Sequence, residues 1–231
     1  MFDPIILHID TATEVCSVTI SRGKEILHTV ETAEPNQHAS KLTLFIQEAF
    51  QQGGIHKEQL HAVAVSMGPG SYTGLRIGVS TAKGLCYGLG IPLIGINTLE
   101  SMFEGYRRTN PLHENSLYWP MIDARRMEVY TATWNTAGQL LHPTSAEIID
   151  DTSFDQYKDQ QVFLFGSGAG KFENTFADKE HIHIVSNFRH SSRSMCTLAL
   201  QRFMDNSFED LVYFEPFYLK EFIATTPRKT I

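Results

Sequence analysis

The sequence predicts an α/β fold made of two similar halves, each with a mixed sheet and flanking helices. Three observations predict it. Apolar stretches of strand length alternate with segments of helical periodicity, glycine-rich turns follow two of the strands, and the order of elements recurs along the chain. We therefore assign residues 1–110 to an N-terminal lobe and residues 111–231 to a C-terminal lobe, with a cleft between them.

The first half begins as a β-meander and continues as alternating helices and strands. A short apolar strand ends at Asp10, and the first helix carries an apolar face and ends at Gly53-Gly54. The expected strands cover residues 5–9, 15–21, 25–31, 60–65 and 92–96, and the expected helices cover residues 38–52, 74–88 and 98–108.

The segment SMGPGSYTGLRIG joins the fourth strand to the second helix. Gly68-Pro69-Gly70 breaks the strand, because proline fixes φ and glycine adopts positive φ. Ser71 and Thr73 can cap the helix, and a glycine turn ahead of a helix N-terminus can hold an anion through backbone N–H groups. Because the spacing matches neither the P-loop nor the dinucleotide fingerprint, anion binding and a plain tight turn are equally compatible with this segment.

The second half repeats this order. Residues 121–124, MIDA, resemble residues 9–12, IDTA, so that Asp123 takes the place of Asp10 at a strand end. A strand at residues 162–165 runs into GSGAG at residues 166–170, and the repeated order predicts a helix after this second glycine turn as well. Both strand-end acids and both glycine turns are expected to converge on the cleft.

Several motifs resemble known families. ILHIDTATE resembles the first phosphate loop of the actin, Hsp70 and sugar-kinase superfamily, which implies a duplicated actin-like, ribonuclease H-like fold. The motifs IDTAT, QHASKLTLFI, VSMGPGSYTGLRIGVSTAKGLCYGLGIPLIGINTLES and MIDARRMEVYTA are similar, in this order, to those of the TsaB (YeaZ) family. The resemblance covers most of residues 5–135 and continues weakly through GSGAGKF and EPFYL.

This resemblance implies a role in tRNA modification. TsaB-like proteins are non-catalytic subunits of the complex that transfers a threonylcarbamoyl group from threonylcarbamoyl-AMP to N6 of adenosine 37, in tRNAs that read codons beginning with A. The family implies that the chain stabilises and activates a TsaD-like catalytic subunit and helps recruit a TsaE-like ATPase. It implies a homodimer when the chain is alone, and contact with tRNA through the complex.

The resemblance also implies that catalytic and metal-binding residues are absent. The related TsaD carries an HxxxH metal motif, in which two imidazoles one helical turn apart grip one ion. Thr98 and Met102 occupy these two positions here. The alternatives are an autonomous actin-fold ATPase or kinase and a glycoprotease-type metallopeptidase, and the missing ligands argue against the latter.

Two sets of site residues follow. A degenerate nucleotide or anion loop, with weak nucleotide binding possible and no resident cofactor, is expected because Asp123 is followed by Ala-Arg-Arg rather than by a hydroxyl-rich turn. The expected loop residues are Asp10, Thr11, Thr13, Gly68, Gly70 and Ser71. The helix at residues 74–88 is apolar around more of its circumference than packing on one sheet requires. The resemblance favours a partner over an internal contact as the cover of this excess and of the apolar face of the preceding helix. The expected interface residues are Leu42, Phe45, Ile46, Leu75, Val79, Ala82, Leu85 and Cys86.

Composition limits the partners and the cellular location that we expect for the chain. The formal net charge of −7 predicts weak binding of RNA by the isolated chain, because nucleic-acid affinity comes mainly from Lys and Arg at phosphates. Three widely spaced cysteines indicate reduced thiols rather than a disulfide framework. The N-terminus has no basic region, and no apolar run approaches the length of a membrane helix. We expect a cytoplasmic protein without membrane partners.

Overall fold

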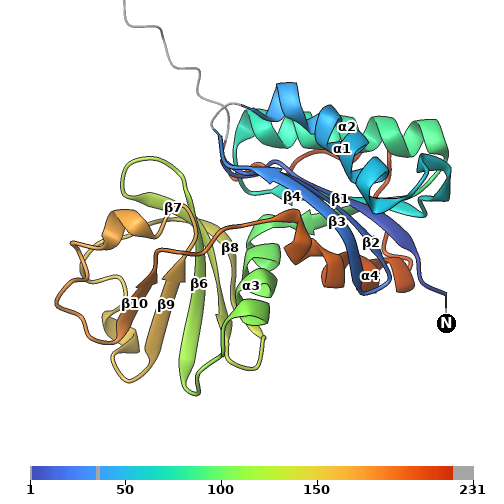
Figure 1. Cartoon of the computed structure of the whole chain (residues 1–231). Coiled ribbons are helices and arrows are strands. Elements are labelled where there is room, and N and C mark those ends of the chain that lie inside the picture. The colour runs from blue at the N-terminus through green and yellow to red at the C-terminus, as the bar shows by residue number, and fades with distance from the viewer. Residues whose placement is uncertain (1, 35–36, 221–231) are drawn as a thin grey trace, which may run out of the picture.

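The computed structural model describes residues 2–34 and 37–220, and this part of the chain forms two lobes, each built on a five-stranded mixed sheet (Figure 1). The tail that begins at residue 222 lies outside the described residues. The first sheet has the order β3-β2-β1-β4-β5. Its strands are β1 (Ile5–Asp10), β2 (Cys16–Arg22), β3 (Glu25–Thr32), β4 (Ala62–Gly68) and β5 (Leu93–Asn97).

The second sheet repeats this topology. Its order, β8-β7-β6-β9-β10, matches the first sheet strand for strand, with two antiparallel pairings on one side of the central strand and two parallel pairings on the other. Its strands are β6 (Ser116–Asp123), β7 (Glu128–Asn135), β8 (Leu140–Ile148), β9 (Gln161–Phe165) and β10 (Ile182–Val185). The predicted duplication and the actin-like fold class are confirmed.

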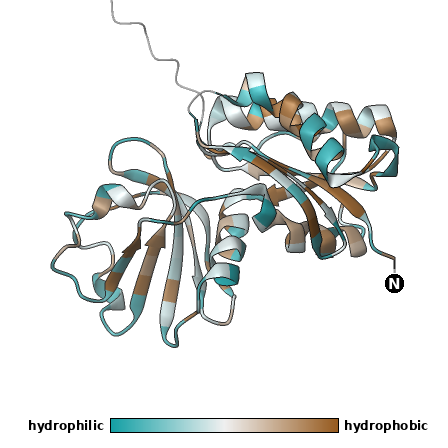
Figure 2. Ribbon diagram, in the orientation of Figure 1, coloured by the Kyte–Doolittle hydropathy of each residue, from teal (hydrophilic) through white to brown (hydrophobic). Residues whose placement is uncertain are grey.

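Helices cover both faces of the first sheet. Alternate residues of its strands point to opposite faces, so Val63 and Val65 of β4 pack under α1 (His38–Gly53) and α2 (Tyr72–Leu89), while Ala62 and Ala64 pack on the other side against α4 (Cys196–Met204). Figure 2 shows the hydrophobic stretches along the strands that these helices cover. The first lobe is therefore a three-layer α/β unit.

Two helices pack across the boundary expected at residue 110. Helix α3 (Thr98–Thr109) contributes Leu99, Met102 and Phe103 to a core that it shares with β6 and β7 of the second sheet. In the other direction, the chain leaves β10 and returns to the first lobe, where Ala199 of α4 packs on Ile6. Each lobe thus takes a helix from beyond the expected boundary, because the sheet face left open by its own helices needs a cover.

The local signals for helix ends agree with the structure. Ser71 caps α2, and its side-chain oxygen accepts a hydrogen bond from the backbone N–H of Gly74 at 3.2 Å. Asn97 caps α3 in the same way. Gly54 and Gly90 end α1 and α2 in the left-handed conformation, which glycine adopts without strain. The predicted helix after the second glycine turn is wrong: the chain forms a 3-10 helix there, Gly170–Phe172.

Within the described ranges, none of the helices is long and apolar enough to cross a membrane.

Candidate functional site

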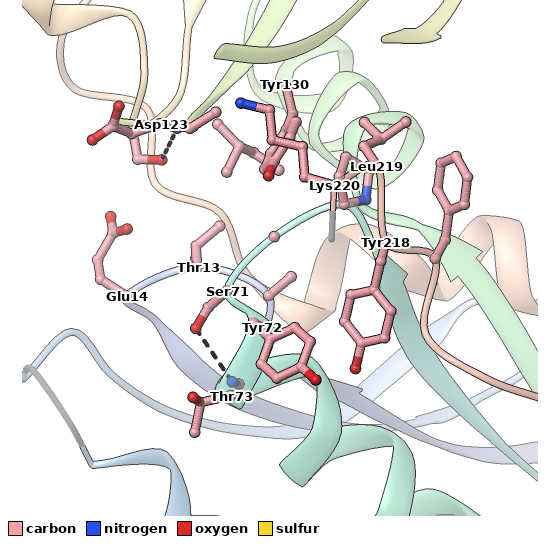
Figure 3. Close-up of a pocket in the computed structure, with 18 of the residues that line it drawn as sticks. Thr13, Glu14, Ser71, Tyr72, Thr73, Asp123, Tyr130, Tyr218, Leu219 and Lys220 are labelled. Atoms are coloured by element: carbon pink, nitrogen blue, oxygen red, sulfur yellow. Dashed lines mark hydrogen bonds between the residues drawn. The ribbon is translucent and has the colours of Figure 1, made fainter. Parts of the chain in front are cut away.

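A cavity of about 950 Å³ lies where the strand ends of the two lobes face each other (Figure 3). The first lobe contributes the turn after β1 and the start of α2, and the second lobe contributes the turn after β6 and Ser167 of the second glycine turn. The polar lining residues are Thr13, Glu14, His38, Ser71, Tyr72, Thr73, Asp123, Arg125, Tyr130, Ser167, Tyr218 and Lys220. The predicted convergence of both glycine turns on an inter-lobe cleft is therefore seen in the structure.

The first glycine turn is held tightly against the turn after β1. The backbone N–H of Ser71 donates to the carbonyl of Ala12 at 2.7 Å. A Cβ atom at Gly70 would collide with that same carbonyl, and Gly68 has a φ of +120°. These two positions require glycine because backbone passes against backbone and because the turn needs positive φ. The turn is therefore a fixed wall of the cavity.

Asp10 does not line the cavity. Its carboxylate is buried, where Oδ1 accepts a hydrogen bond from the N–H of Ala12 at 3.0 Å and Oδ2 lies against Nε2 of His190. Burial raises the pKa of Asp10, but the charge and contact of His190 and the hydrogen bonds to the carboxylate lower it more, so the net shift is downward. The imidazole occupies the side of the carboxylate that a cation would need.

The other predicted loop residues divide into two groups. Thr11 and Gly68 are buried and do not line the cavity, and Thr11 donates from Oγ1 to the carbonyl of Gly74 at 2.7 Å, which ties the end of β1 to α2. The predicted residues that line the cavity are Thr13, Gly70 and Ser71. Three of the six predicted residues therefore reach the cavity, and Asp10, Thr11 and Gly68 have a structural place behind it.

Asp123 of the second lobe has a different setting. Its side chain is about half exposed, and Oδ1 accepts a charge-assisted hydrogen bond from Nζ of Lys171 at 2.6 Å. Lys171 also donates to the carbonyl of Glu128 at 2.7 Å, so it clamps the turn between β6 and β7. Arg125 in this turn has a φ of +74°, and its N–H donates to Asp123 at 3.1 Å. This acid is engaged by a lysine but stays at the cavity surface.

The C-terminal segment crosses the cavity and was missed as a site element. The N–H of Phe217 donates to the carbonyl of Met67 at 2.7 Å, and the rings of Tyr218 and Tyr72 lie 4.8 Å apart. Lys220 pairs with Glu128 of the second lobe. Figure 3 shows Tyr218, Leu219 and Lys220 along one side of the cavity. The sequence signal that could have found this segment is the EPFYL motif.

His190 was missed too, and the sequence holds no signal for it. It follows β10 by several residues and reaches Asp10 because the chain crosses from the second lobe to the first there. A contact across about 180 positions depends on the packing of two lobes and leaves no local pattern.

The positions aligned with a metal motif lie in a hydrophobic core. Thr98 and Met102 are buried on α3, and Met102 packs in the core shared with β6 and β7. Within residues 2–34 and 37–220, no group of three or more His, Cys, Asp or Glu side chains is arranged to hold a metal ion.

Most of the predicted partner face is buried inside the first lobe. The buried residues of this set are Leu42, Ile46, Leu75, Val79, Ala82 and Cys86. All of them except Leu75 belong to the core between the helices and the sheet, and Leu75 is buried as well. The prediction that these residues face a partner is therefore wrong, and the internal alternative holds for them. Phe45 and Leu85 are partly exposed. The open surface of the same helices carries Leu44 and Tyr87, 54% and 83% exposed, and Gly84 and Gly88, where an added Cβ would meet open space.

Comparisons with known proteins agree with this architecture. The TsaB protein of tRNA threonylcarbamoyladenosine biosynthesis from Escherichia coli is 37% identical over 129 residues, or 56% of this chain and 54% of that protein. The TsaB protein of Bacillus subtilis is 28% identical over 70% of each chain. The structure of YeaZ from Pseudomonas aeruginosa superposes with a TM-score of 0.78 at 20% identity, covering 94% of this chain and all of that one.

The match to the E. coli relative thus spans about half of that protein's length, whereas the structural likeness extends over almost the whole fold. The family model described as TsaD, tRNA N6-adenosine threonylcarbamoyltransferase, matches residues 27–221, which is most of the chain. The chain therefore belongs to the family that this model describes, and within it to the TsaB (YeaZ) branch.

Proposed function

We propose that this chain is a non-catalytic subunit of the machinery that transfers a threonylcarbamoyl group to N6 of adenosine 37 in tRNA. In this role it stabilises and activates a TsaD-like catalytic subunit and helps recruit a TsaE-like ATPase. Support comes from the family and from relatives that are named for tRNA threonylcarbamoyladenosine biosynthesis. Contact with tRNA is made through the complex.

The proposal rests mainly on the contacts that the two strand-end acids, Asp10 and Asp123, make within the chain. In an actin-like fold these acids would hold a metal ion and polarise water. Here Asp10 is buried against His190, and Asp123 is paired with Lys171. Both carboxylates are already occupied by a nitrogen-bearing side chain, which favours a structural role of the cleft over phosphoryl transfer.

We place the partner surface on the open side of α1 and α2. Leu44 and Tyr87 are large and exposed there, and exposed apolar side chains are typical of the core of a protein interface. Gly84 and Gly88 leave room for a second backbone to approach closely. The same surface would join two copies of this chain when the catalytic subunit is absent, so the homodimer and the complex compete for it.

The test is reconstitution with the TsaD protein of the same genome. We expect the wild-type chain to co-elute with TsaD and to be required for threonylcarbamoylation of tRNA by the full set of proteins. The double variant Leu44→Glu/Tyr87→Glu should stay folded and lose at least tenfold in affinity for TsaD, because two charges would be buried without partners. The matched control is Ile148→Glu, at a site 75% exposed on β8 of the second lobe.

The outcomes separate the alternatives. Loss of both association and activity in the double variant, with an intact control, supports the proposal. Full activity of the double variant would move the partner surface elsewhere, and transfer activity at the wild-type level without this chain would remove the scaffold role. Val79→Asp, in the core of the first lobe, is expected to unfold the protein rather than to act as an interface variant.

We further propose that the inter-lobe cavity binds nucleotide weakly and without turnover. Its volume fits a nucleotide, and the capped start of α2 with Ser71 and Thr73 offers the geometry that holds phosphate. Calorimetry with ATP and ADP should give dissociation constants no tighter than about 0.1 mM, with no release of phosphate. Sustained hydrolysis of ATP by the pure chain would favour the ATPase alternative instead.

A further inference from the structure

A second cavity, of about 600 Å³, lies at a different place in the fold. It is formed by the edge strand β3, the C-terminal end of α3 and the segment between β10 and α4. Its charged and amide-bearing lining residues are Glu31, Arg108, Asn110, Asn187, Arg189 and Arg193. None of these residues belongs to the inter-lobe cavity or to the open surface of α1 and α2.

Three arginines in one pocket stand out in a chain whose net charge is −7. The ion pairs among the described residues involve other side chains, so Arg108, Arg189 and Arg193 have no carboxylate partner within that part of the chain. The carboxylate of Glu31 also lines the pocket, but its Oε2 accepts hydrogen bonds from Ser17 at 3.2 Å and from Ser191 at 2.6 Å. The guanidinium groups outnumber this carboxylate, so the pocket is positive.

Ordinary structural roles account for only part of this cluster. Arg108 lies in the last turn of α3, where a cation interacts favourably with the helix dipole, and it donates to Thr197 at 3.3 Å. The neighbouring Arg107 is already paired with Glu104. Arg193 lies in the 3-10 helix Ser192–Met195, which leads into the N-terminal end of α4, where the helix dipole does not favour a cation. Arg189 lies outside any helix, on the segment that crosses between the lobes.

The wall that carries these two arginines is fixed by the first sheet. The N–H of Ser192 donates to Oγ of Ser17 at 3.1 Å, and the hydroxyls of Ser192 and Thr19 lie 2.7 Å apart. His190 lies against Asp10. Arg189 and Arg193 therefore flank an anchored stretch, and their guanidinium groups start from a defined backbone, which lowers the entropy lost on binding.

We infer that this pocket binds a phosphate-bearing ligand, with Arg108, Arg189 and Arg193 as the N–H donors. The planar guanidinium group matches the geometry of phosphate oxygens and stays charged at all physiological pH values. The volume is that of a site for a nucleotide-sized molecule. The phosphate belongs either to a free nucleotide or to the backbone of an RNA strand, two sources with the same chemistry. The inference does not depend on the proposed role beside TsaD.

The test compares two triple variants of the full chain that change charge equally. The pocket variant is Arg108→Gln/Arg189→Gln/Arg193→Gln, and the control is Lys24→Gln/Lys57→Gln/Lys158→Gln, three exposed lysines that do not line the pocket. Inorganic phosphate and AMP are titrated with the ¹⁵N-labelled proteins by NMR, and unmodified tRNA is titrated by fluorescence anisotropy at about 50 mM salt, where phosphate contacts are strongest. Circular dichroism checks that both variants are folded.

Wild-type protein and the control are expected to bind phosphate and AMP with shifts in the amides of residues 105–110 and 187–194. The pocket variant should bind at least tenfold more weakly. If tRNA also loses affinity in the pocket variant, and its salt slope falls by about 0.7 to 0.9 for each lost contact, the source is RNA backbone. If tRNA binding is unchanged and AMP binding is lost, the source is a free nucleotide. Equal binding by all three proteins, or no binding of any of the three ligands, would overturn the inference.

Discussion

The two lobes share one topology but treat their strand-end acids in opposite ways. Asp10 ends β1 and is buried against His190, whereas Asp123 ends the equivalent strand β6 and is half exposed beside Lys171. The partner of Asp10 comes from the segment that returns from the second lobe, and the partner of Asp123 comes from its own lobe. The topology is thus repeated because the strands of each sheet must pair and the faces of each sheet must be covered. The chemistry at the strand ends depends instead on which segment packs over them.

The two glycine turns also differ between the lobes. The first turn leads into α2, an 18-residue helix packed on the sheet, and the second leads into a three-residue 3-10 helix. Gly70 is pressed against Ala12, whereas a Cβ atom at Gly170 would meet open space. Inside the second turn, however, Gly166 has a φ of +102°, and a Cβ atom there would collide with the carbonyl of Met121. Both turns are therefore held against the end of the central strand, and they differ in the helix that follows them.

The largest expected difference between the lobes concerns their ion pairs. His190→Ala should lower the free energy of unfolding by about 3–5 kcal/mol, because it leaves the buried carboxylate of Asp10 without the imidazole that contacts it. Lys171→Ala should cost no more than about 1 kcal/mol, because Asp123 can turn to water. Urea denaturation of the two variants measures both losses in the free energy of unfolding. Equal losses would mean that the burial of Asp10 does not make its contact stronger than that of Asp123.

A second difference concerns pH. His8 lies in the middle of β1, where the duplicated strand β6 has Met121, and burial lowers the pKa of His8 from 6.5 to about 3. Between these two pH values the unfolded chain binds a proton at His8 and the folded chain does not. The contribution of neutral His8 to the free energy of unfolding is therefore fully present above pH 6.5 and is lost as the pH falls from 6.5 toward 3. At 1.36 kcal/mol for each pKa unit, the loss is on the order of 5 kcal/mol.

The substitution His8→Met tests this pH dependence, because it places at His8 the residue that the second lobe has at the equivalent position, Met121. It removes the contact of Nε2 with Ser21 at 2.8 Å and should lower stability at neutral pH. It should also flatten the dependence of unfolding free energy on pH between 6.5 and 4, as measured by denaturation at a series of pH values. An unchanged slope in this variant would assign the acid sensitivity to other groups.

The smallest effect compares the glycine turns. Gly70→Ala should cost about 1–3 kcal/mol, because the new methyl group overlaps the carbonyl of Ala12 and the wall must shift. Gly170→Ala should change stability by less than about 0.5 kcal/mol, since the site is open. Thermal unfolding of both variants is the measurement. A tolerated alanine at Gly70 would show that the first turn is less rigid than its contacts indicate.

The sequence by itself determined the duplicated fold and its local signals. The strand and helix periodicities, the cap at Ser71 and the glycine at Gly54 depend on neighbours within a few residues, and such signals can be read without a structure. The family resemblance and the inter-lobe cleft also followed from motifs in order. Thr13, Gly70 and Ser71 were placed at the site because a strand end and a glycine turn carry their own geometry.

The tertiary structure decided which surfaces cover the apolar faces and which distant residues meet, and periodicity in the sequence cannot show either. An apolar helix face has the same sequence pattern whether a sheet or a partner covers it, and the structure assigns Leu42 and Val79 to the internal core. Helix α4 covers a face of the first sheet although it follows the last strand of the second sheet, and α3 covers the second sheet rather than only its own. His190 and the arginine pocket arise from contacts between segments that are distant in sequence. Long-range packing brings such groups together, so no local pattern records them.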